Sequence, residues 1–204
     1  MTPTEEQFCL FQEMGLATTQ WAHVEGELCR VVLCCFKEAD REAVSLGFFS
    51  IENFRSKCGF SDKIICNYLS DDALLSRWKK LLERIRDASA LRNALAHRSL
   101  NVHLHGKAGR RCLLVPWTYE KPTRKTRTPM PPPGSFGVRD VAGFRLQFFA
   151  ISISLKNFSF ALRGQPEPFP EPSEQAMASP TIHGLTRQIR EVLSTLPAPS
   201  PQKH

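Results

Sequence analysis

The sequence predicts an all-α protein, namely a bundle of four or more helices with a small β-hairpin insertion and a Pro-rich C-terminal tail. Three observations carry this prediction. Apolar residues recur every three or four positions in several long segments, which is the period of an α-helix. Val102, Leu104 and the run 112–115 flank a Gly-containing stretch at 106–109, which is typical of a β-hairpin. After Gly164 the number of prolines rises, and such a composition disfavours a packed core.

The first two helical segments carry both apolar stripes and breaking signals. We expect a helix over about 5–38, interrupted near Gly15, and a second helix that begins at Ser50 and breaks near Gly59. A further helical stretch follows the second break, and a new helix is expected to begin at Asp71. The stripe of the first segment is Trp21, Val24, Leu28, Val31 and Cys35.

Two later helices are predicted most clearly. No Gly or Pro occurs from residue 71 to about 98, and the last core helix is expected over about 138–163. Both segments carry apolar residues at alternating steps of three and four, so each should bury one face. The first stripe is Leu74, Trp78, Leu81, Ile85 and Ala88, and the second is Val141, Phe144, Phe148, Ile151, Leu155, Phe158 and Leu162.

These elements define the expected organisation of the chain. Residues 1–163 form a helical domain, which includes the hairpin at 101–117 and a basic, Pro-rich loop at 118–136. Residues 164–204 form a Pro-rich extension. A short amphipathic helix is predicted within it at about 180–196, where Ser179 can cap the helix and Pro180 can occupy its first turn.

Composition limits the classes of function. The 204 residues are 42% hydrophobic, and the net charge of +7 with a pI of about 9.2 favours acidic partners such as nucleic acid. The N-terminus lacks the basic and apolar regions of a signal peptide. The longest apolar runs are far shorter than the roughly 20 residues that span a bilayer. We therefore expect a soluble, cytoplasmic protein with no membrane partner.

The cysteines and histidines do not indicate a metal centre. Seven cysteines occur without a CxxC spacing, which favours reduced, buried thiols over a disulfide framework. His103 and His105 would share one face of a strand, but no third or fourth ligand lies near them in the sequence. We expect neither a bound metal nor a cofactor.

The end of the helix that begins at Asp71 carries the candidate functional residues. A step of four from Ala88 reaches Arg92, so the period predicts an arginine on the buried side, where it needs an anion, a carboxylate or water. Asn93 and His97 are four residues apart and share a helix face. The alternative is structural: Arg92 pairs with a carboxylate such as Glu25, and Asn93 and His97 cap the helix end.

The six residues from Arg92 to His97 resemble the Arg-x4-6-His signature of the HEPN family, in which a polar residue follows the Arg directly. The segments Trp21-x3-Glu25-x2-Leu28 and Phe54-Arg55-Ser56-Lys57, together with Trp78, are also similar to family patterns. The resemblance covers about residues 15–163. It implies a homodimer in which the signature helices of two protomers face each other across a composite cleft. Many family members are metal-independent endoribonucleases that act as toxins or defence effectors.

The resemblance gives each residue an expected role. His97 would act as general base or acid, Arg92 would hold phosphate oxygens, and Asn93 would orient the His ring or the phosphate. The expected function is a metal-independent endoribonuclease in toxin–antitoxin or anti-phage defence. Two alternatives stay open. One is a non-catalytic HEPN-type module that binds a nucleotide, nucleic acid or partner protein. The other is a helical interaction protein whose C-terminal segment docks elsewhere.

A basic region adds an independent indication of RNA binding. Residues 101–145 contain nine cations and two anions, so the rest of the chain is neutral overall. Such a concentration of charge could contact an RNA backbone, with Trp117 and Tyr119 stacking on bases. A solvated loop that keeps the protein soluble is the alternative. The expected partners are RNA, a second copy of the chain, and an antitoxin or other protein. The expected RNA contacts are Lys57, Lys107, Arg110, Arg111, Lys121, Arg124, Lys125 and Arg127.

Overall fold

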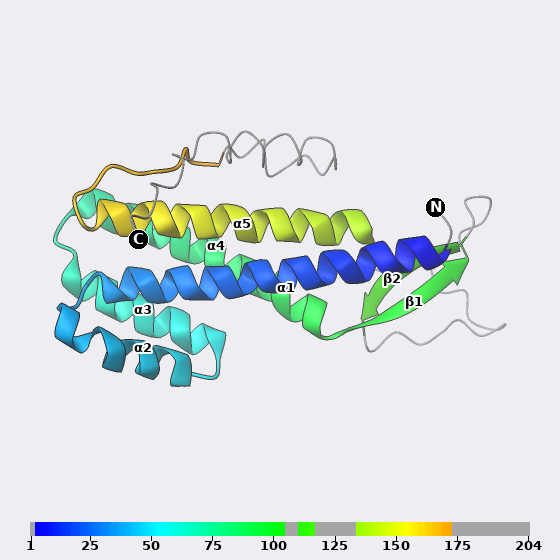
Figure 1. Ribbon diagram of the computed structural model, residues 1–204, viewed down its shortest axis with the longest axis horizontal. Coiled ribbons are helices and arrows are strands. Elements are labelled where there is room, and N and C mark those ends of the chain that lie inside the picture. The colour runs from blue at the N-terminus through cyan, green and yellow to red at the C-terminus, as the bar shows by residue number, and fades with distance from the viewer. Residues whose placement is uncertain (1–2, 105–109, 117–133, 173–204) are drawn as a thin grey trace, which may run out of the picture.

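The chain folds into three long helices, a helical pair at one end and a hairpin at the other, which confirms the predicted fold class (Figure 1). A computed structural model describes residues 3–104, 110–116 and 134–172. The elements are α1 (Pro3–Leu33), the 3-10 helix η1 (Glu38–Asp40), α2 (Arg41–Ser50), α3 (Phe54–Tyr68), α4 (Asp72–Ala96), β1 (Arg98–Leu104), β2 (Arg110–Pro116) and α5 (Val138–Ala161).

α1 is continuous, so the expected break at Gly15 is wrong. The helix begins at Pro3 and ends at Leu33, five residues before the predicted end. Gly15 lies within its solvent-exposed face, and packing of the opposite face against α5 holds the helix together there. Tertiary contacts therefore outweigh the weak preference of a single glycine for irregular structure.

The predictions for 38–70 need two corrections. A helix that the stripe analysis missed, α2, ends at Ser50 instead of beginning there, and Asn53 caps the next helix by accepting the N–H of Arg55 at 2.8 Å. α3 then runs through Gly59 without a break. Its buried side, which includes Cys58 and Ile65, packs on the rest of the bundle on both sides of that glycine.

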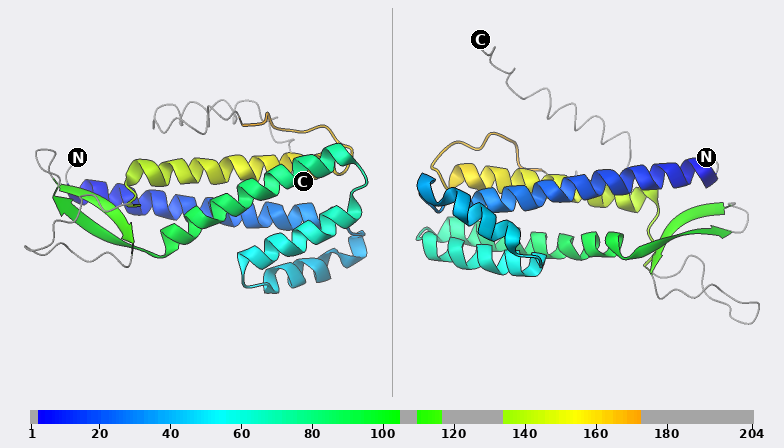
Figure 2. Two further views of the ribbon diagram at one scale, coloured as in Figure 1. Left: turned by 180° about the vertical axis from the view of Figure 1, so that it is seen from behind. Right: turned by 60° about the horizontal axis from the view of Figure 1, so that its bottom comes forward.

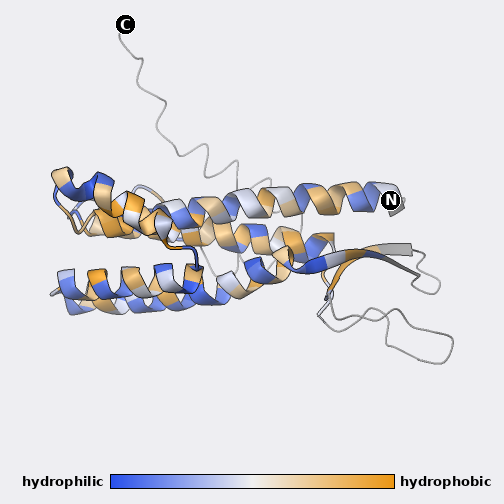
Figure 3. Ribbon diagram, turned by 90° about the horizontal axis from the view of Figure 1, so that it is seen from below, coloured by the Kyte–Doolittle hydropathy of each residue, from blue (hydrophilic) through white to orange (hydrophobic). Residues whose placement is uncertain are grey.

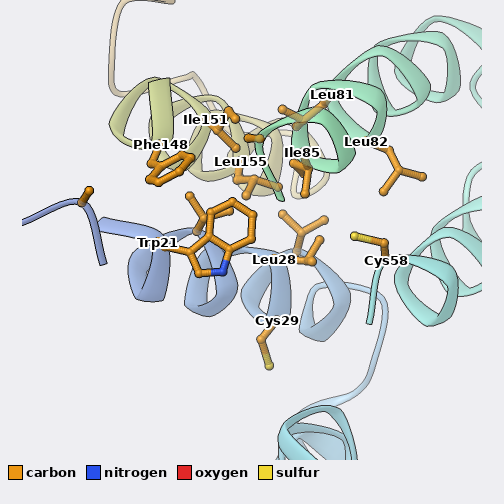
Figure 4. Packing of buried hydrophobic residues seen from close by; sticks show 14 of the residues in the cluster. Trp21, Leu28, Cys29, Cys58, Leu81, Leu82, Ile85, Phe148, Ile151 and Leu155 are labelled. Atoms are coloured by element: carbon orange, nitrogen blue, oxygen red, sulfur yellow. The ribbon is translucent and has the colours of Figure 1, made fainter. Parts of the chain in front are cut away.

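α4 and α5 follow the predicted stripes closely. Asp71 caps α4 by accepting the N–H of Leu74 at 2.9 Å, as expected. Every residue of the α5 stripe is buried or packed against the core. Figure 4 shows side chains of α1, α4 and α5 gathered between these helices, with Cys58 of α3 beside them, while Cys29 of α1 points away from α4 and α5. The residues labelled there are Trp21, Leu28, Cys29, Cys58, Leu81, Leu82, Ile85, Phe148, Ile151 and Leu155.

The hairpin continues directly from α4. β1 and β2 pair antiparallel, with Arg98 opposite Pro116, so the first strand begins three residues earlier than predicted. Phe136 adds a short third pairing through two hydrogen bonds with Leu114, of 2.8 and 2.9 Å. Gly134 precedes this pairing with φ of +74°, a conformation that favours glycine. Figure 2 shows α4 crossing α1 and α5 obliquely and extending past α3 to the hairpin.

The cysteines are free thiols, and three of them, Cys29, Cys58 and Cys112, are buried. Burial raises the pKa of Cys58 to about 11 and that of Cys35 to about 12. Both thiols therefore stay protonated at neutral pH, which makes them poor nucleophiles and poor metal ligands. Among the residues that the structure describes, no helix has both the length and the apolar content needed to cross a bilayer.

Candidate functional site

The signature residues lie at the end of α4 and are all exposed. Arg92, Asn93 and His97 occupy its last turns, where the helix extends beyond the N-terminus of α3 (Figure 2). The Arg92 Nη1 donates a hydrogen bond to Asn93 Oδ1 at 3.1 Å. His97 is the C-cap residue, and its backbone N–H donates to the Asn93 carbonyl at 3.1 Å. The side-chain contact therefore joins only Arg92 and Asn93, because the N–H of His97 makes an ordinary backbone bond of the α-helix.

Arg92 does not lie on the buried side, so that prediction is wrong. The buried face of α4 passes from Ala88 to Leu91 and Leu95, because the step after Ala88 is three residues and not four. Arg92 therefore faces solvent with its guanidinium accessible. An exposed cation has no desolvation cost to offset, and it remains free to bind an anion from outside the chain.

The alternative pairing of Arg92 with Glu25 is absent because Glu25 is occupied elsewhere. Lys57 Nζ lies 3.1 Å from Glu25 Oε2, and the Trp21 indole N–H donates to Glu25 Oε1 at 3.0 Å. The Lys57 ammonium also lies 5.4 Å from the ring centroid of Phe48. Lys57, which we expected to contact RNA, is only 7% exposed. These contacts give Lys57 a partner within the fold.

Two of the segments that carry the HEPN resemblance contact each other. The Trp21 ring lies 4.6 Å from the Phe54 ring and 5.1 Å from the Phe148 ring, measured between centroids. Together with the Glu25–Lys57 ion pair, these contacts join α1 to α3 and α5. Trp21, Glu25, Phe54 and Lys57 therefore have a structural role here, whereas Arg55 and Ser56 of the second segment are exposed.

A second polar cluster surrounds Asp62 on α3. Its carboxylate accepts hydrogen bonds from the Trp78 indole at 3.0 Å and from Lys79 at 2.8 Å, and Cys66 lies 3.3 Å away. Burial of Asp62 opposes ionisation, but the hydrogen bonds from Lys79, Trp78 and Cys66 outweigh it and lower the pKa of the carboxyl. Toward the N-terminus of α3, an open pocket is lined by Arg55, Gly59 and Arg86.

Arg98 is a further cation that the sequence analysis did not single out. Its guanidinium carbon lies 3.8 Å from the centroid of the Phe136 ring, and a Cβ at Gly134 would lie 3.5 Å from its Nη2. The buried Nε and Nη1 have no hydrogen-bond partner within the described ranges. Desolvation by burial lowers the pKa of Arg98. In the sequence, only the position of Arg98 directly after His97 could have indicated that this residue belongs to the candidate site.

The remaining predicted RNA contacts are described in part or lie outside the described residues. The backbones of Arg110 and Arg111 belong to β2, opposite Leu104 and His103 of β1. Outside the described residues lie Lys107, Lys121, Arg124, Lys125 and Arg127, as well as Trp117, Tyr119, His105 and the predicted helix at about 180–196.

Within the described part of the chain, no three His, Cys, Asp or Glu side chains come together in a way that could hold a metal ion. No protein-family model matches the sequence, and neither the curated proteins nor the solved structures contain a match to the chain. The resemblance of the sequence to the HEPN family and the geometry of the candidate residues are therefore the two indications of function.

Proposed function

We propose that the protein is a metal-independent endoribonuclease of HEPN type, with Arg92, Asn93 and His97 as its catalytic residues and a toxin or anti-phage effector role. The observation that supports this most directly is the exposure of all three side chains on the last turns of α4. Arg92 forms no ion pair with a carboxylate among the described residues, so its guanidinium is available for phosphate oxygens.

The chemistry needs only groups of this kind. The imidazole of His97 removes the proton of a ribose 2′-OH as a general base. The 2′-oxygen attacks the adjacent phosphorus and the bond to the 5′-oxygen breaks. The leaving 5′-oxygen takes a proton from water, which gives a 2′,3′-cyclic phosphate and a 5′-OH end. Arg92 opposes the charge that develops on the phosphate oxygens. Asn93, bonded to Arg92 at 3.1 Å, fixes the direction of the guanidinium.

A second copy of the chain completes the proposed site. One exposed helix end leaves the phosphate in contact with water, which weakens every electrostatic interaction there. Two copies of the α4 end, facing each other, would exclude water and bring the Arg92 of one protomer toward the His97 of the other. The cytoplasm is the expected location, and an antitoxin or another protein is an expected partner.

The test is RNA cleavage by purified protein in EDTA, with His97→Ala and Arg92→Ala prepared in parallel. We expect cleavage by the wild type and a loss of at least about 100-fold in each variant. This is the usual contribution of general acid–base catalysis for His97 and of a group that stabilises transition-state charge for Arg92. Lys80→Ala, which removes an exposed cation from the same helix, is the matched control and should retain activity. Undiminished cleavage by His97→Ala would contradict the proposal.

The basic loop gives a second test of RNA binding. Changing Lys121, Arg124, Lys125 and Arg127 to Glu should weaken binding and reduce its salt dependence. Each lost phosphate contact lowers the slope of log K against log salt by roughly 0.7–0.9. Affinity measured at several salt concentrations checks this, and an unchanged slope would exclude the loop as a contact.

The alternative is a non-catalytic module that binds a nucleotide or another phosphate-bearing partner. The pocket lined by Arg55, Gly59 and Arg86 favours it, because two arginines lie at one opening near the N-terminus of α3. Calorimetric titration with ATP distinguishes the alternatives. Binding that is lost in Arg55→Ala and Arg86→Ala, together with no RNA cleavage by the wild type, would establish the module and exclude the nuclease.

A further inference from the structure

The side of α4 that faces α3 continues beyond the start of α3. Lys79 binds Asp62 of α3 at 2.8 Å, and Arg86 Nη2 lies 3.9 Å from the other oxygen of the same carboxylate, so both cations mark this side. At 3.6 residues per turn, Asn93 and His97 lie within about 20° of Arg86 around the helix axis. Arg86, Asn93 and His97 therefore share one side of α4. Figure 3 shows α4 running on from the start of α3 toward the hairpin, with hydrophilic residues in that stretch.

A pocket opens on this side of α4 where α3 begins. It is lined by Arg55 in the first turn of α3, by Gly59 one turn later and by Arg86 of α4. Its volume of about 610 Å³ lies within the roughly 300–1,000 Å³ of ligand pockets and is ample for a phosphate group. Because Arg86 lines the pocket and shares a side of α4 with Asn93 and His97, the pocket and the candidate catalytic residues belong to one surface.

The two arginines of the pocket are weakly neutralised by the fold. Within the described ranges, the side chain of Arg55 forms no hydrogen bond or ion pair. Arg86 meets Asp62 only at 3.9 Å, which is the outer limit of an ion pair, and the Arg86 side chain is 53% exposed. The Asp62 carboxylate already accepts hydrogen bonds from Trp78 and Lys79, so its charge is balanced without Arg86. The pocket therefore has a positive charge that favours an anion.

Gly59 leaves room for such an anion. A Cβ built at Gly59 would meet nothing within 4 Å, and the residue has no positive φ, so the fold of the chain does not require glycine there. Because Gly59 lines the pocket, a longer side chain at this position would extend into the open space beside Arg55 and Arg86. The acidic residues closest to the two arginines along the chain are exposed and do not line the pocket, namely Glu52, Glu83 and Asp87.

We propose that this pocket holds a phosphate group of the RNA strand that His97 cleaves, so that the strand lies along α4 from Arg86 to His97. The inference rests on the proposed function, because it adds a second contact with the same substrate. At a rise of 1.5 Å per residue, Arg86 and His97 are about 16 Å apart along the helix axis. A strand of a few nucleotides spans this distance, so the phosphate in the pocket is not the one that is cleaved. Guanidinium groups suit this role because they hold phosphate oxygens through paired hydrogen bonds.

Two separate contacts on one strand make the length of the RNA matter. A dinucleotide contains a single phosphate between its sugars, so it occupies either the catalytic residues or the pocket and never both. A longer strand occupies both sites at once and gains the binding energy of the pocket for the reaction at His97. A change in the pocket should therefore affect long RNA and leave a dinucleotide unaffected.

The test measures binding of a labelled single-stranded RNA of about 12 nucleotides, a length typical of single-strand sites, to the full-length protein by fluorescence anisotropy. All proteins carry His97→Ala, so that the RNA stays intact. Two variants change the pocket. Arg55→Ala removes one guanidinium, and Gly59→Glu places a carboxylate four residues from Arg55, on the same helix face, where it takes the place of the phosphate. The matched controls are Lys80→Ala and Gly26→Glu, since a Cβ at Gly26 likewise meets nothing within 4 Å. Circular dichroism checks that each variant folds.

We expect each pocket variant to weaken RNA binding roughly tenfold, the size of one hydrogen bond to a charged group. The slope of log K against log salt should fall by about 0.7, the value for one phosphate contact of a single strand, whereas both controls should keep the original slope. With His97 intact, the pocket variants should raise KM for the long RNA and leave cleavage of a dinucleotide unchanged.

The outcomes separate the pocket from the nuclease. Unchanged affinity and slope in both pocket variants would overturn the inference, whether or not the wild type cleaves RNA. RNA that binds through the pocket and is never cleaved would support the pocket and contradict only the proposed function. A parallel titration with ATP identifies a free nucleotide as the occupant if Arg55→Ala removes ATP binding and does not change RNA affinity, and this result would also overturn the inference.

Discussion

The polar residues in the two halves of α4 have opposite environments. In the first half, Trp78 is fully buried against Phe158 and donates its indole N–H to Asp62, which also binds Lys79. In the last turns, Arg92, Asn93 and His97 face solvent, and the only side-chain hydrogen bond among them joins Arg92 to Asn93. One helix thus supplies core packing at one end and an accessible polar surface at the other.

The difference arises from what covers each half. α3 lies alongside the first half of α4 and provides Asp62. Its N-terminus stops short of the last turns of α4 (Figure 2). Polar groups with partners inside the fold should therefore contribute to stability, and polar groups without such partners should contribute to binding or catalysis. Four predictions test this division, from the largest expected effect on stability to the smallest.

Trp78→Ala should have the largest effect. It removes the fully buried ring that stacks on Phe158 at 5.6 Å and leaves Asp62 with one donor fewer. Large-to-alanine changes of this kind cost about 3–5 kcal/mol. Urea unfolding measures the change in the free energy of unfolding, and a loss below about 1 kcal/mol would show that the first half of α4 does not anchor the core.

Glu25→Ala should come next. It leaves the ammonium of Lys57 without its carboxylate partner at a position that is only 7% exposed. Removing one partner of a buried pair costs about 3 kcal/mol. The control is the double variant Glu25→Ala with Lys57→Met, which should lose less than the sum of the two single changes because no unpaired charge remains. Additive losses would contradict the coupling.

Asp62→Asn should change how stability depends on pH. The pKa of Asp62 is lowered in the folded protein, so its ionised form stabilises the fold above the unfolded pKa of about 3.9, and this contribution is lost as pH falls through the folded value. Thermal unfolding between pH 5 and pH 2 should show a shallower loss of stability in Asp62→Asn than in the wild type. Parallel curves for the two proteins would exclude this role.

Arg92→Ala and His97→Ala should have the smallest effect on stability. Both side chains are exposed and outside the core, and surface changes of this kind stay within about 0.5 kcal/mol. The same variants are expected to lose RNA cleavage, so stability and activity should separate. A loss of stability above 1 kcal/mol would mean that the last turns of α4 are held by contacts of these side chains, and the division between the two halves would fail.

Sequence patterns located some elements much better than others. The stripe of α5 and the start of α4 at Asp71 were predicted closely, because long runs of alternating steps bury one continuous face. Gly15 and Gly59 were expected to break helices and do not, since packing on both sides of each glycine holds the helix. α2 was missed because it has only 10 residues and buries only Phe48.

The sequence by itself located the long helices α4 and α5 and showed which residue types stand together between Arg92 and His97. Both properties depend on local order along the chain. Only the tertiary structure decided the exposure of those residues. Leu91 and Leu95 pack on the core and Arg92 faces solvent, in the part of α4 that extends beyond α3 (Figure 2). Tertiary packing likewise decided that Glu25 forms an ion pair with Lys57, because partners 32 positions apart in sequence meet only when α1 and α3 pack together.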